Sequence, residues 1–288
     1  MKVFVTGGTG AVGFPVVCNL HKHGYSVRAL SRSAKSETKL KEVGVSVIAG
    51  DLENHQDWLP VLDDCEAIVH MALGFTPEDD KIEQNFLSSL MASRSGKTPL
   101  IFVQTGGCWM YGNTGNRLAN EGDPFDSSGA WSWWMKNTEM LLSSDHLDTR
   151  IVHPAMVWSR SGSCFGMMDD IKKGNPVRVH ENADHRWTLV NDEDLADLYR
   201  LVLEKGKKRE HYNGAGEEGV CIGQLARKLC KAHEHHSWLD VVAIADTIRE
   251  QGAWAEGYGL DQQMSSAKAR QELGWKPQHS NIFAAFSG

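Results

Sequence analysis

A short apolar run followed by three regularly spaced glycines opens the chain. Residues 3–5 (VFV) indicate a buried parallel strand, and glycines follow at positions 7, 10 and 13. Gly7 permits a tight turn, Gly10 lets a pyrophosphate approach the backbone, and Gly13 lets the next helix pack close to the strand. The unpaired N–H groups and positive dipole end of that helix favour phosphates. The pattern predicts a dinucleotide-binding strand–turn–helix unit, with a ligand-free glycine-rich turn as the alternative.

Short strands alternate with helical stretches through the first two-thirds of the chain. The expected strands are residues 3–5, 26–31, 46–49, 67–72, 100–104 and 149–152, and the first expected helix is 12–23. Repeated strand–helix units imply right-handed crossovers and a parallel sheet with helices on both faces. Beyond about residue 160 the pattern loosens, with helices expected near 192–204, 222–234 and 240–251. The fold class is therefore α/β: a Rossmann-type doubly wound parallel sheet over 1–158, to which later segments can return, and a smaller, partly helical substrate lobe over 159–288.

Composition restricts the partners of such a fold. The formal net charge of −7 argues against nucleic-acid binding, which needs a basic surface. The sequence has no apolar run of about 18 residues, and Met1-Lys2 leads directly into a strand, so we expect neither a membrane span nor a signal peptide. Six scattered cysteines indicate reduced thiols of a cytoplasmic protein rather than a disulfide framework; they stand at positions 18, 65, 108, 164, 221 and 230.

The end of the second expected strand bears on the choice between NAD and NADP. An NAD site needs a carboxylate there for the ribose 2′-hydroxyl, whereas an NADP site needs cations for the 2′-phosphate. The sequence at this point is Ser31-Arg32-Ser33-Ala34-Lys35, which contains no acid. Arg32 can make a forked contact with a phosphate, and Ser31 or Ser33 can add a hydroxyl. These residues favour NADP(H), with a solvated surface arginine as the alternative.

Further segments, in order along nearly the whole chain, strengthen this interpretation. They are Thr6–Gly13 (TGGTGAVG), Asp51-Leu52, His70-Met71-Ala72, Asn85, Tyr111-Gly112, His153–Val157 (HPAMV), Ser266–Arg270 and Leu273–Pro277. Together they resemble the extended short-chain dehydrogenase/reductase family, which contains sugar-nucleotide epimerases, dehydratases and related reductases. The resemblance implies a homodimer formed through the helices after the fourth and fifth strands. It also implies cofactor contacts from Gly7, Thr9, Gly10, Ala11, Val12, Gly13, Asp51, Leu52, Met71, Ala72 and Pro154.

The chain departs from the catalytic pattern of that family. The resemblance implies a tyrosine and a lysine four residues apart on one helix, where the lysine holds the nicotinamide ribose and the tyrosine moves a proton. Lys136 matches the lysine, but Ser132 occupies the tyrosine position, and a serine hydroxyl is too weak an acid to replace a phenol. Gly107 stands where the family places a serine or threonine. Thr105 and Tyr111 are the nearby candidates to replace the missing groups, although the family tyrosine matching Tyr111 is usually structural.

Histidines, a cysteine and tryptophans offer further candidate site residues. His153 and His185 can serve as an acid or base near neutral pH, while a structural role is the alternative. Cys108 is best explained as a buried thiol. The run 233–236 (HEHH) shows no third ligand, so we expect no metal site. An apolar, aromatic substrate pocket is predicted from a cluster of tryptophans, with core packing as the alternative; they are Trp109, Trp131, Trp133, Trp134 and Trp158.

These features predict an NADP(H)-dependent enzyme that acts on a small hydroxyl or carbonyl substrate. Lys136 would hold the nicotinamide ribose, and Thr105, Ser132 with a water molecule, or Tyr111 would handle the proton. Two alternatives stay open: a non-redox isomerase, lyase or cyclase that retains NADP, and a catalytically silent NADP(H)-sensing regulatory protein. The missing tyrosine favours the alternatives, whereas Lys136 and the tryptophan cluster favour an enzyme.

Overall fold

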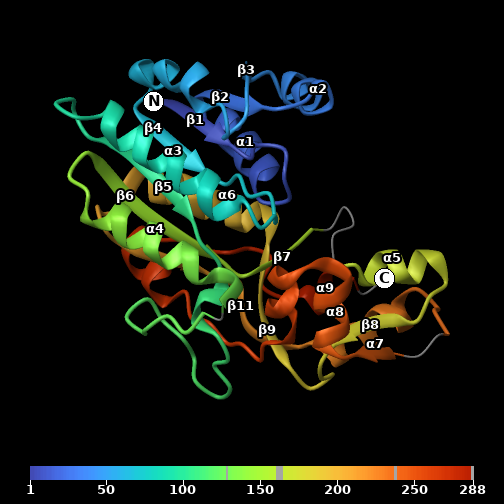
Figure 1. Ribbon diagram of the computed structural model, residues 1–288. Helices are drawn as coiled ribbons and strands as arrows, with labels where there is room; N and C mark the ends of the chain where they lie inside the picture. Colours follow the sequence, from blue (N-terminus) through green and yellow to red (C-terminus); the bar gives the residue numbers. More distant parts are fainter. Residues whose placement is uncertain (128, 160–164, 237–238, 287–288) are drawn as a thin grey trace. The chain divides into compact units, whose positions relative to one another are not determined.

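The computed structural model describes residues 1–127, 129–159, 165–236 and 239–286 (Figure 1). The chain divides into two units. Unit 1 comprises Met1–Gly106, Ser132–Val152 and Leu195–Tyr212, and unit 2 comprises Gly107–Trp131, His153–Asp194 and Asn213–Gly288. We predicted a first domain over 1–158 to which later segments can return. In the structure residues 195–212 belong to unit 1 and residues 107–131 to unit 2.

Unit 1 is built on a seven-stranded sheet in the order β10-β6-β5-β4-β1-β2-β3. Its strands are β1 (Lys2–Thr6), β2 (Ser26–Ser31), β3 (Ser46–Ala49), β4 (Ala67–His70), β5 (Leu100–Thr105), β6 (Leu147–Pro154) and β10 (His211–Gly214). The pairs from β6 through β5, β4, β1 and β2 to β3 are parallel. Strand order reverses at β1, and in such sheets ligands bind at the carboxyl ends of the strands at this point. The predicted doubly wound parallel sheet is confirmed.

Helices flank this sheet (Figure 1). They are α1 (Gly13–Lys22), α2 (Ala34–Val43), α3 (Asp79–Ser93), α4 (Ser132–Ser143) and α6 (Asp192–Lys205), with short 3-10 turns η1 (His55–Asp57) and η2 (Leu59–Asp64). Local sequence fixes the ends of α2, because the Ser33 hydroxyl accepts from the Ser36 N–H and Gly44 adopts a left-handed φ of 89° after the last turn. Beneath β1, Phe4 stacks on Trp58 at 5.0 Å between ring centroids. The pair belongs to an apolar core that also contains Ile68 of β4 and Phe102 of β5.

Unit 2 contains two small sheets, in the orders β11-β9-β7 and β12-β8. Their strands are β7 (Met156–Trp158), β8 (Val177–His180), β9 (Arg186–Asn191), β11 (Glu217–Cys221) and β12 (Leu239–Val242). The described helices are α5 (Met167–Lys173), α7 (Ile222–Ala232), α8 (Ile244–Gln251) and α9 (Ile282–Ala285). The unit also contains 3-10 segments η3 (Cys108–Tyr111), η4 (Gly129–Trp131) and η5 (Ala253–Gly259) and the π-helical segment η6 (Ala269–Leu273). Side chains of α7 at 222, 225, 226 and 229 enter the core of this unit.

The expected helix over 240–251 is wrong in its first turn. Residues 239–242 instead form β12, which pairs in parallel with β8. Two β-branched residues, Val241 and Val242, favour an extended backbone when a partner strand is present, and that partner lies about sixty residues earlier in the chain. The helix α8 begins only at Ile244.

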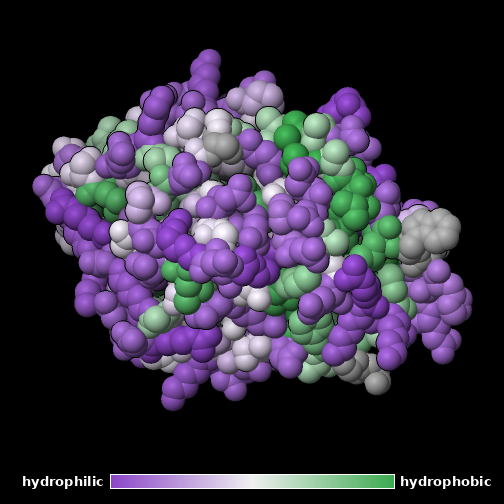
Figure 2. Space-filling model, turned by 90° about the horizontal axis from the view of Figure 1, so that it is seen from below, coloured by the Kyte–Doolittle hydropathy of each residue, from purple (hydrophilic) through white to green (hydrophobic). Residues whose placement is uncertain are grey.

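The face drawn in Figure 2 is largely hydrophilic, with apolar side chains in separate patches. Among the described residues, no helix has the length and apolarity needed to cross a membrane. The same residues hold no group of three His, Cys, Asp or Glu side chains placed to bind a metal. The five described cysteines are free thiols, and Cys164 lies outside the described residues.

Candidate functional site

The glycine-rich turn between β1 and α1 shows why two of its glycines are needed. A Cβ on Gly7, whose φ is +70°, would lie 2.6 Å from the backbone of Met71 and Ala72. A Cβ on Gly13 would lie 2.1 Å from the Gly7 carbonyl oxygen, so any side chain would push the helix away from the turn. Gly10 is exposed, and its N–H donates to the Gly7 carbonyl at 3.1 Å. The turn therefore presents bare backbone at Gly10, which a phosphate can approach.

The beginning of α1 suits an anion. The helix starts at Gly13, no side chain caps it, and its first turn carries no acidic residue. The positive end of the helix dipole thus remains uncompensated by the chain beside the exposed residues Gly10 and Ala11. A dinucleotide pyrophosphate would fit this cradle, held by Gly10, Ala11 and Val12.

A buried polar network supports the turn from below. Thr6 Oγ1 lies 2.7 Å from His70 Nδ1, and His70 Nε2 lies 2.8 Å from Glu83 Oε2. The Met71 N–H donates to Thr6 Oγ1 at 3.3 Å, and Gln104 Nε2 donates to Glu83 Oε1 at 3.1 Å. Because Gly7 rests on the Met71 backbone, the network fixes the surface on which the turn is built. Glu83 was not predicted from the sequence. The feature that could have indicated it is a carboxylate on the apolar face of α3.

At the end of β2 the predicted phosphate-binding residues divide between two roles. The Ser31 hydroxyl donates to the Ser33 carbonyl at 3.1 Å, and the Ser33 hydroxyl caps α2, so both already stabilise the local backbone. The Arg32 side chain is exposed. Lys39, not singled out from the sequence, lies on α2 and donates to the Thr9 carbonyl at 3.2 Å. Lys39 thus contacts the glycine-rich turn, while Arg32 follows the strand that pairs with β1.

The segment after β3 contains two of the residues predicted to contact the cofactor, Asp51 and Leu52. Asp51 and Leu52 are both half-buried in unit 1. The Asp51 carboxylate accepts from the Asn54 N–H at 2.8 Å, and the Asp51 carbonyl accepts from the Trp58 indole at 2.7 Å. Leu52 packs against the apolar core of unit 1. These contacts hold the segment in one conformation.

Three of the four predicted catalytic residues lie in unit 1. Ser132 and Lys136 are one turn apart on α4, and both are exposed. Thr105 ends β5, and its carbonyl accepts from the Trp134 indole at 3.1 Å. Its hydroxyl lies 2.7 Å from the hydroxyl of Tyr199 on α6. The arrangement places a phenol against Thr105, although that phenol comes from a different helix than the family pattern uses.

Tyr199 was not predicted from the sequence. Its side chain is fully buried, and burial raises the pKa of its hydroxyl. The phenolate is therefore strongly disfavoured, and the neutral hydroxyl serves as a partner for Thr105. When Tyr199 donates, the Thr105 proton remains available to a further acceptor. The local sequence indicates only an apolar helix face, to which Tyr199 belongs together with Leu198 and Val202. All three side chains are fully buried.

The remaining predicted residues, Tyr111 and Pro154, lie in unit 2. Tyr111 is almost fully buried and donates to Asn213 Oδ1 at 2.9 Å, and burial raises the pKa of its phenol. Its ring packs on Phe125 and on His153, with centroids 5.2 and 5.8 Å apart. These contacts favour the structural role for Tyr111. Pro154 is buried in the same unit.

Two of three further candidates, Cys108 and His153, are as buried as Tyr111. Burial raises the pKa of Cys108 to about 12, in keeping with an unreactive thiol. His153 is fully buried, and its Nδ1 accepts from the Gly107 N–H at 3.4 Å. His185 is half-buried in unit 2.

The tryptophans expected to form one pocket lie in three settings. Trp109 and Trp131 belong to unit 2, where Trp109 contacts Trp131 at 5.7 Å and Trp254 at 6.3 Å between ring centroids. Trp158 is fully buried in the core of that unit. The remaining two lie on α4 in unit 1; they are Trp133 and Trp134. Core packing accounts for Trp158, while Trp109 begins an aromatic cluster within unit 2.

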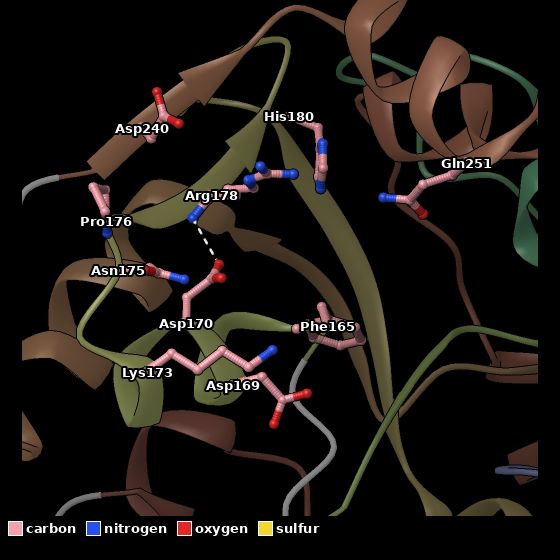
Figure 3. A pocket seen from close by; sticks show the side chains of 11 residues that line it. Phe165, Asp169, Asp170, Lys173, Asn175, Pro176, Arg178, His180, Asp240 and Gln251 are labelled. Carbon is pink, nitrogen blue, oxygen red and sulfur yellow. Dashed lines mark hydrogen bonds between the residues drawn. The ribbon is translucent and has the colours of Figure 1, made fainter.

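A hollow of about 620 Å³ lies within unit 2 and has a different character (Figure 3). Asp170 points to Arg178 and accepts from its backbone N–H at 3.2 Å, and the Arg178 guanidinium pairs with Glu250 at 2.9 Å. His180 reaches the hollow with Nδ1 held 2.8 Å from Thr247 Oγ1, and its pKa is lowered by burial and by Arg178. The lining carries charges of both signs, so this hollow is not the apolar tryptophan pocket that the sequence suggested.

Comparison with known proteins decides the family. A family model described as NAD(P)H-binding matches residues 7–198, about two-thirds of the chain. The chain belongs to this NAD(P)H-binding family. The matched region includes the glycine-rich turn, Arg32, Thr105 and Lys136. Dinucleotide binding, predicted from the first thirteen residues, is thereby supported at the level of the family.

Curated relatives span most of the chain at low identity. The uncharacterized protein YLL056C of Saccharomyces cerevisiae is 27% identical over 98% of this chain and 96% of its own length. A sterol-4-alpha-carboxylate 3-dehydrogenase (decarboxylating) of Dictyostelium discoideum is 25% identical over 76% of this chain and 72% of its own length. One of these two relatives is thus named as a dehydrogenase.

Solved structures match the whole fold. The dTDP-glucose 4,6-dehydratase DesIV of Streptomyces venezuelae, with NAD and TYD bound, aligns with a TM-score of 0.83 at 18% identity over 96% of this chain and 92% of its own. The human epimerase family protein SDR39U1, with NADPH, aligns with a TM-score of 0.80 at 17% identity over 100% and 98%. These likenesses confirm the predicted extended short-chain dehydrogenase/reductase fold. One neighbour holds NAD and the other NADPH, so the choice of dinucleotide has to be argued from this chain.

Proposed function

We propose that this protein is an NADP(H)-dependent oxidoreductase that acts on a small hydroxyl or carbonyl substrate. The observation that carries the proposal is the exposed Arg32 at the end of β2, in a segment without a carboxylate, beside a glycine-rich turn that fits a pyrophosphate. A cation at this position suits the 2′-phosphate and leaves the ribose of NAD without its usual acidic partner. The nicotinamide, when bound, supplies or accepts the hydride.

Residues of unit 1 would position the reacting groups. Lys136 is exposed on α4 and would donate hydrogen bonds to the nicotinamide ribose. Ser132, one turn earlier on the same helix, would hold a water molecule that exchanges a proton with the substrate oxygen. Thr105 would donate to the same oxygen while its own oxygen accepts from Tyr199. The hydroxyl pair would polarise the carbonyl, and the water would give a proton to the substrate oxygen and regain one from bulk solvent, which divides the work of the missing tyrosine.

A second candidate is a non-redox isomerase, lyase or cyclase that retains NADP, and a third is an NADP(H)-sensing regulatory protein. The contacts of two tyrosines favour these two candidates. Tyr199 faces Thr105 from a fully buried position, and Tyr111 donates to Asn213. Both phenols have a pKa raised by burial, so neither is suited to release a proton. The exposed Lys136 and Ser132 favour catalysis.

The first experiment is single-turnover oxidation of bound NADPH with a library of small ketones and aldehydes. We expect loss of the nicotinamide absorbance with some of them, and Lys136→Met should slow that step by at least about tenfold because one charged hydrogen bond to the ribose is removed. Glu139→Gln, a charge change one turn later on α4, is the matched control. Product without an absorbance change would indicate the non-redox enzyme, and binding without any product would indicate the sensor.

A further inference from the structure

Lys39 connects α2 to the glycine-rich turn. Its ammonium donates to the Thr9 carbonyl at 3.2 Å and lies 3.8 Å above the centroid of the Phe14 ring, in the first turn of α1. Ser36, one turn earlier on α2, receives a hydrogen bond from the Thr9 hydroxyl at 3.4 Å. Thr9 is therefore held on both its backbone and its side chain by the same face of α2.

These contacts act on the part of the turn that approaches a pyrophosphate. Thr9 directly precedes Gly10, whose bare backbone is the point of approach. The Gly10 N–H donates to the Gly7 carbonyl at 3.1 Å and its carbonyl accepts from the Phe14 N–H at 3.0 Å, so the backbone bonds of Gly10 lie within the turn and α1, and the contacts to Thr9 add a restraint from α2. A restraint on Thr9 thus lowers the number of conformations that the turn must give up on binding, and preorganisation of this kind increases affinity.

The position of Lys39 separates its role from that of Arg32. Lys39 is half-buried with its ammonium against Thr9 and Phe14, whereas Arg32 is exposed at the strand end. We propose that Lys39 is a positioning residue that orders the glycine-rich turn and so strengthens NADH and NADPH binding equally. This rests on dinucleotide binding by the family and not on the preference for NADP(H), because the turn contacts the part common to both dinucleotides.

The test measures NADPH and NADH affinities of the Lys39→Met variant by isothermal titration. Methionine keeps the stem over Phe14 and removes the hydrogen bond to Thr9. We expect both affinities to fall by about tenfold, with their ratio changed by less than about twofold. Amide exchange in the protein without dinucleotide should become faster at residues 8–14. Lys39→Arg, which keeps a cation over the ring, should retain both affinities and slow exchange.

The matched control is Lys41→Met, which removes the same charge from the same helix at a residue paired with Glu37. It should leave both affinities within about twofold of the wild type. A Lys39→Met loss confined to NADPH would make Lys39 a phosphate ligand and overturn the proposal, as would unchanged affinities. If the wild-type protein bound neither dinucleotide, the proposed function would fail, and unchanged exchange at residues 8–14 would still overturn the role of Lys39. Should Lys39→Met not fold, Lys39→Gln repeats both measurements.

Discussion

At the scale of one residue, Arg32 carries the proposed preference for NADPH. Its guanidinium is exposed and can make a bidentate, charge-assisted contact with a phosphate. Because NADH lacks the 2′-phosphate, we expect Arg32→Ala to weaken NADPH binding by about tenfold and to leave NADH binding nearly unchanged. Isothermal titration of both dinucleotides at fixed ionic strength measures the two effects separately.

Lys35→Ala is the matched control for Arg32, since it removes a nearby exposed cation in the first turn of α2. It should lower NADPH affinity less than Arg32→Ala, through a general loss of positive charge that added salt screens. Equal affinities of the wild type for NADPH and NADH would remove the basis for the NADP(H) assignment.

At the scale of elements, Arg186 joins the start of β9 to the segment after η5. Its side chain makes two hydrogen bonds to the Asp261 carboxylate, at 3.0 and 2.7 Å, and this pairing lowers the pKa of Asp261 below its ordinary value of 3.8. A depressed carboxyl pKa gives stability that is present above pH 3.8 and is lost as pH falls through the folded-state pKa. We expect Arg186→Met to lower the free energy of unfolding by about 1 kcal/mol at pH 7, because the pair is partly exposed.

The stability lost in Arg186→Met should become smaller below pH 4 and vanish where Asp261 is protonated in the folded protein. Urea denaturation of both proteins at pH 7, 5, 4 and 3 measures this loss. The comparison is Arg178→Met, which breaks the pair with Glu250, whose two side chains are about half exposed. It should cost less than about 0.5 kcal/mol at each pH. A cost of Arg186→Met that did not change with pH would show that lost packing, and not the charge, is responsible.

At the scale of the whole molecule, local signals and long-range contacts explain what the sequence could predict. Strands 26–31 and 46–49 were predicted at their observed bounds, because each contains a short apolar stretch that ends at polar or turn-forming residues. The glycine-rich turn was equally accessible, since its geometry depends on adjacent residues. Tyr199 was missed because its partner Thr105 lies 94 residues away, and β12 was missed because its partner strand is distant in sequence. Contacts of this kind leave no local pattern.

Unit 1 is completed by a segment that lies far along the chain from the rest of it. Residues 195–212 belong to this unit, and the Arg150 guanidinium of β6 donates to the Val202 carbonyl of α6 at 2.7 Å. Four fully buried side chains come from this stretch: Leu198, Tyr199, Val202 and Tyr212. Burial of each large side chain contributes about 1.5–3 kcal/mol, so the four together approach the whole stability of a typical domain. A fragment of residues 1–158 should therefore bind a hydrophobic dye and melt without cooperativity, while the full chain in the same assay melts in a sharp transition. A cooperative, dye-free fragment would mean that the first 158 residues fold without α6 and β10.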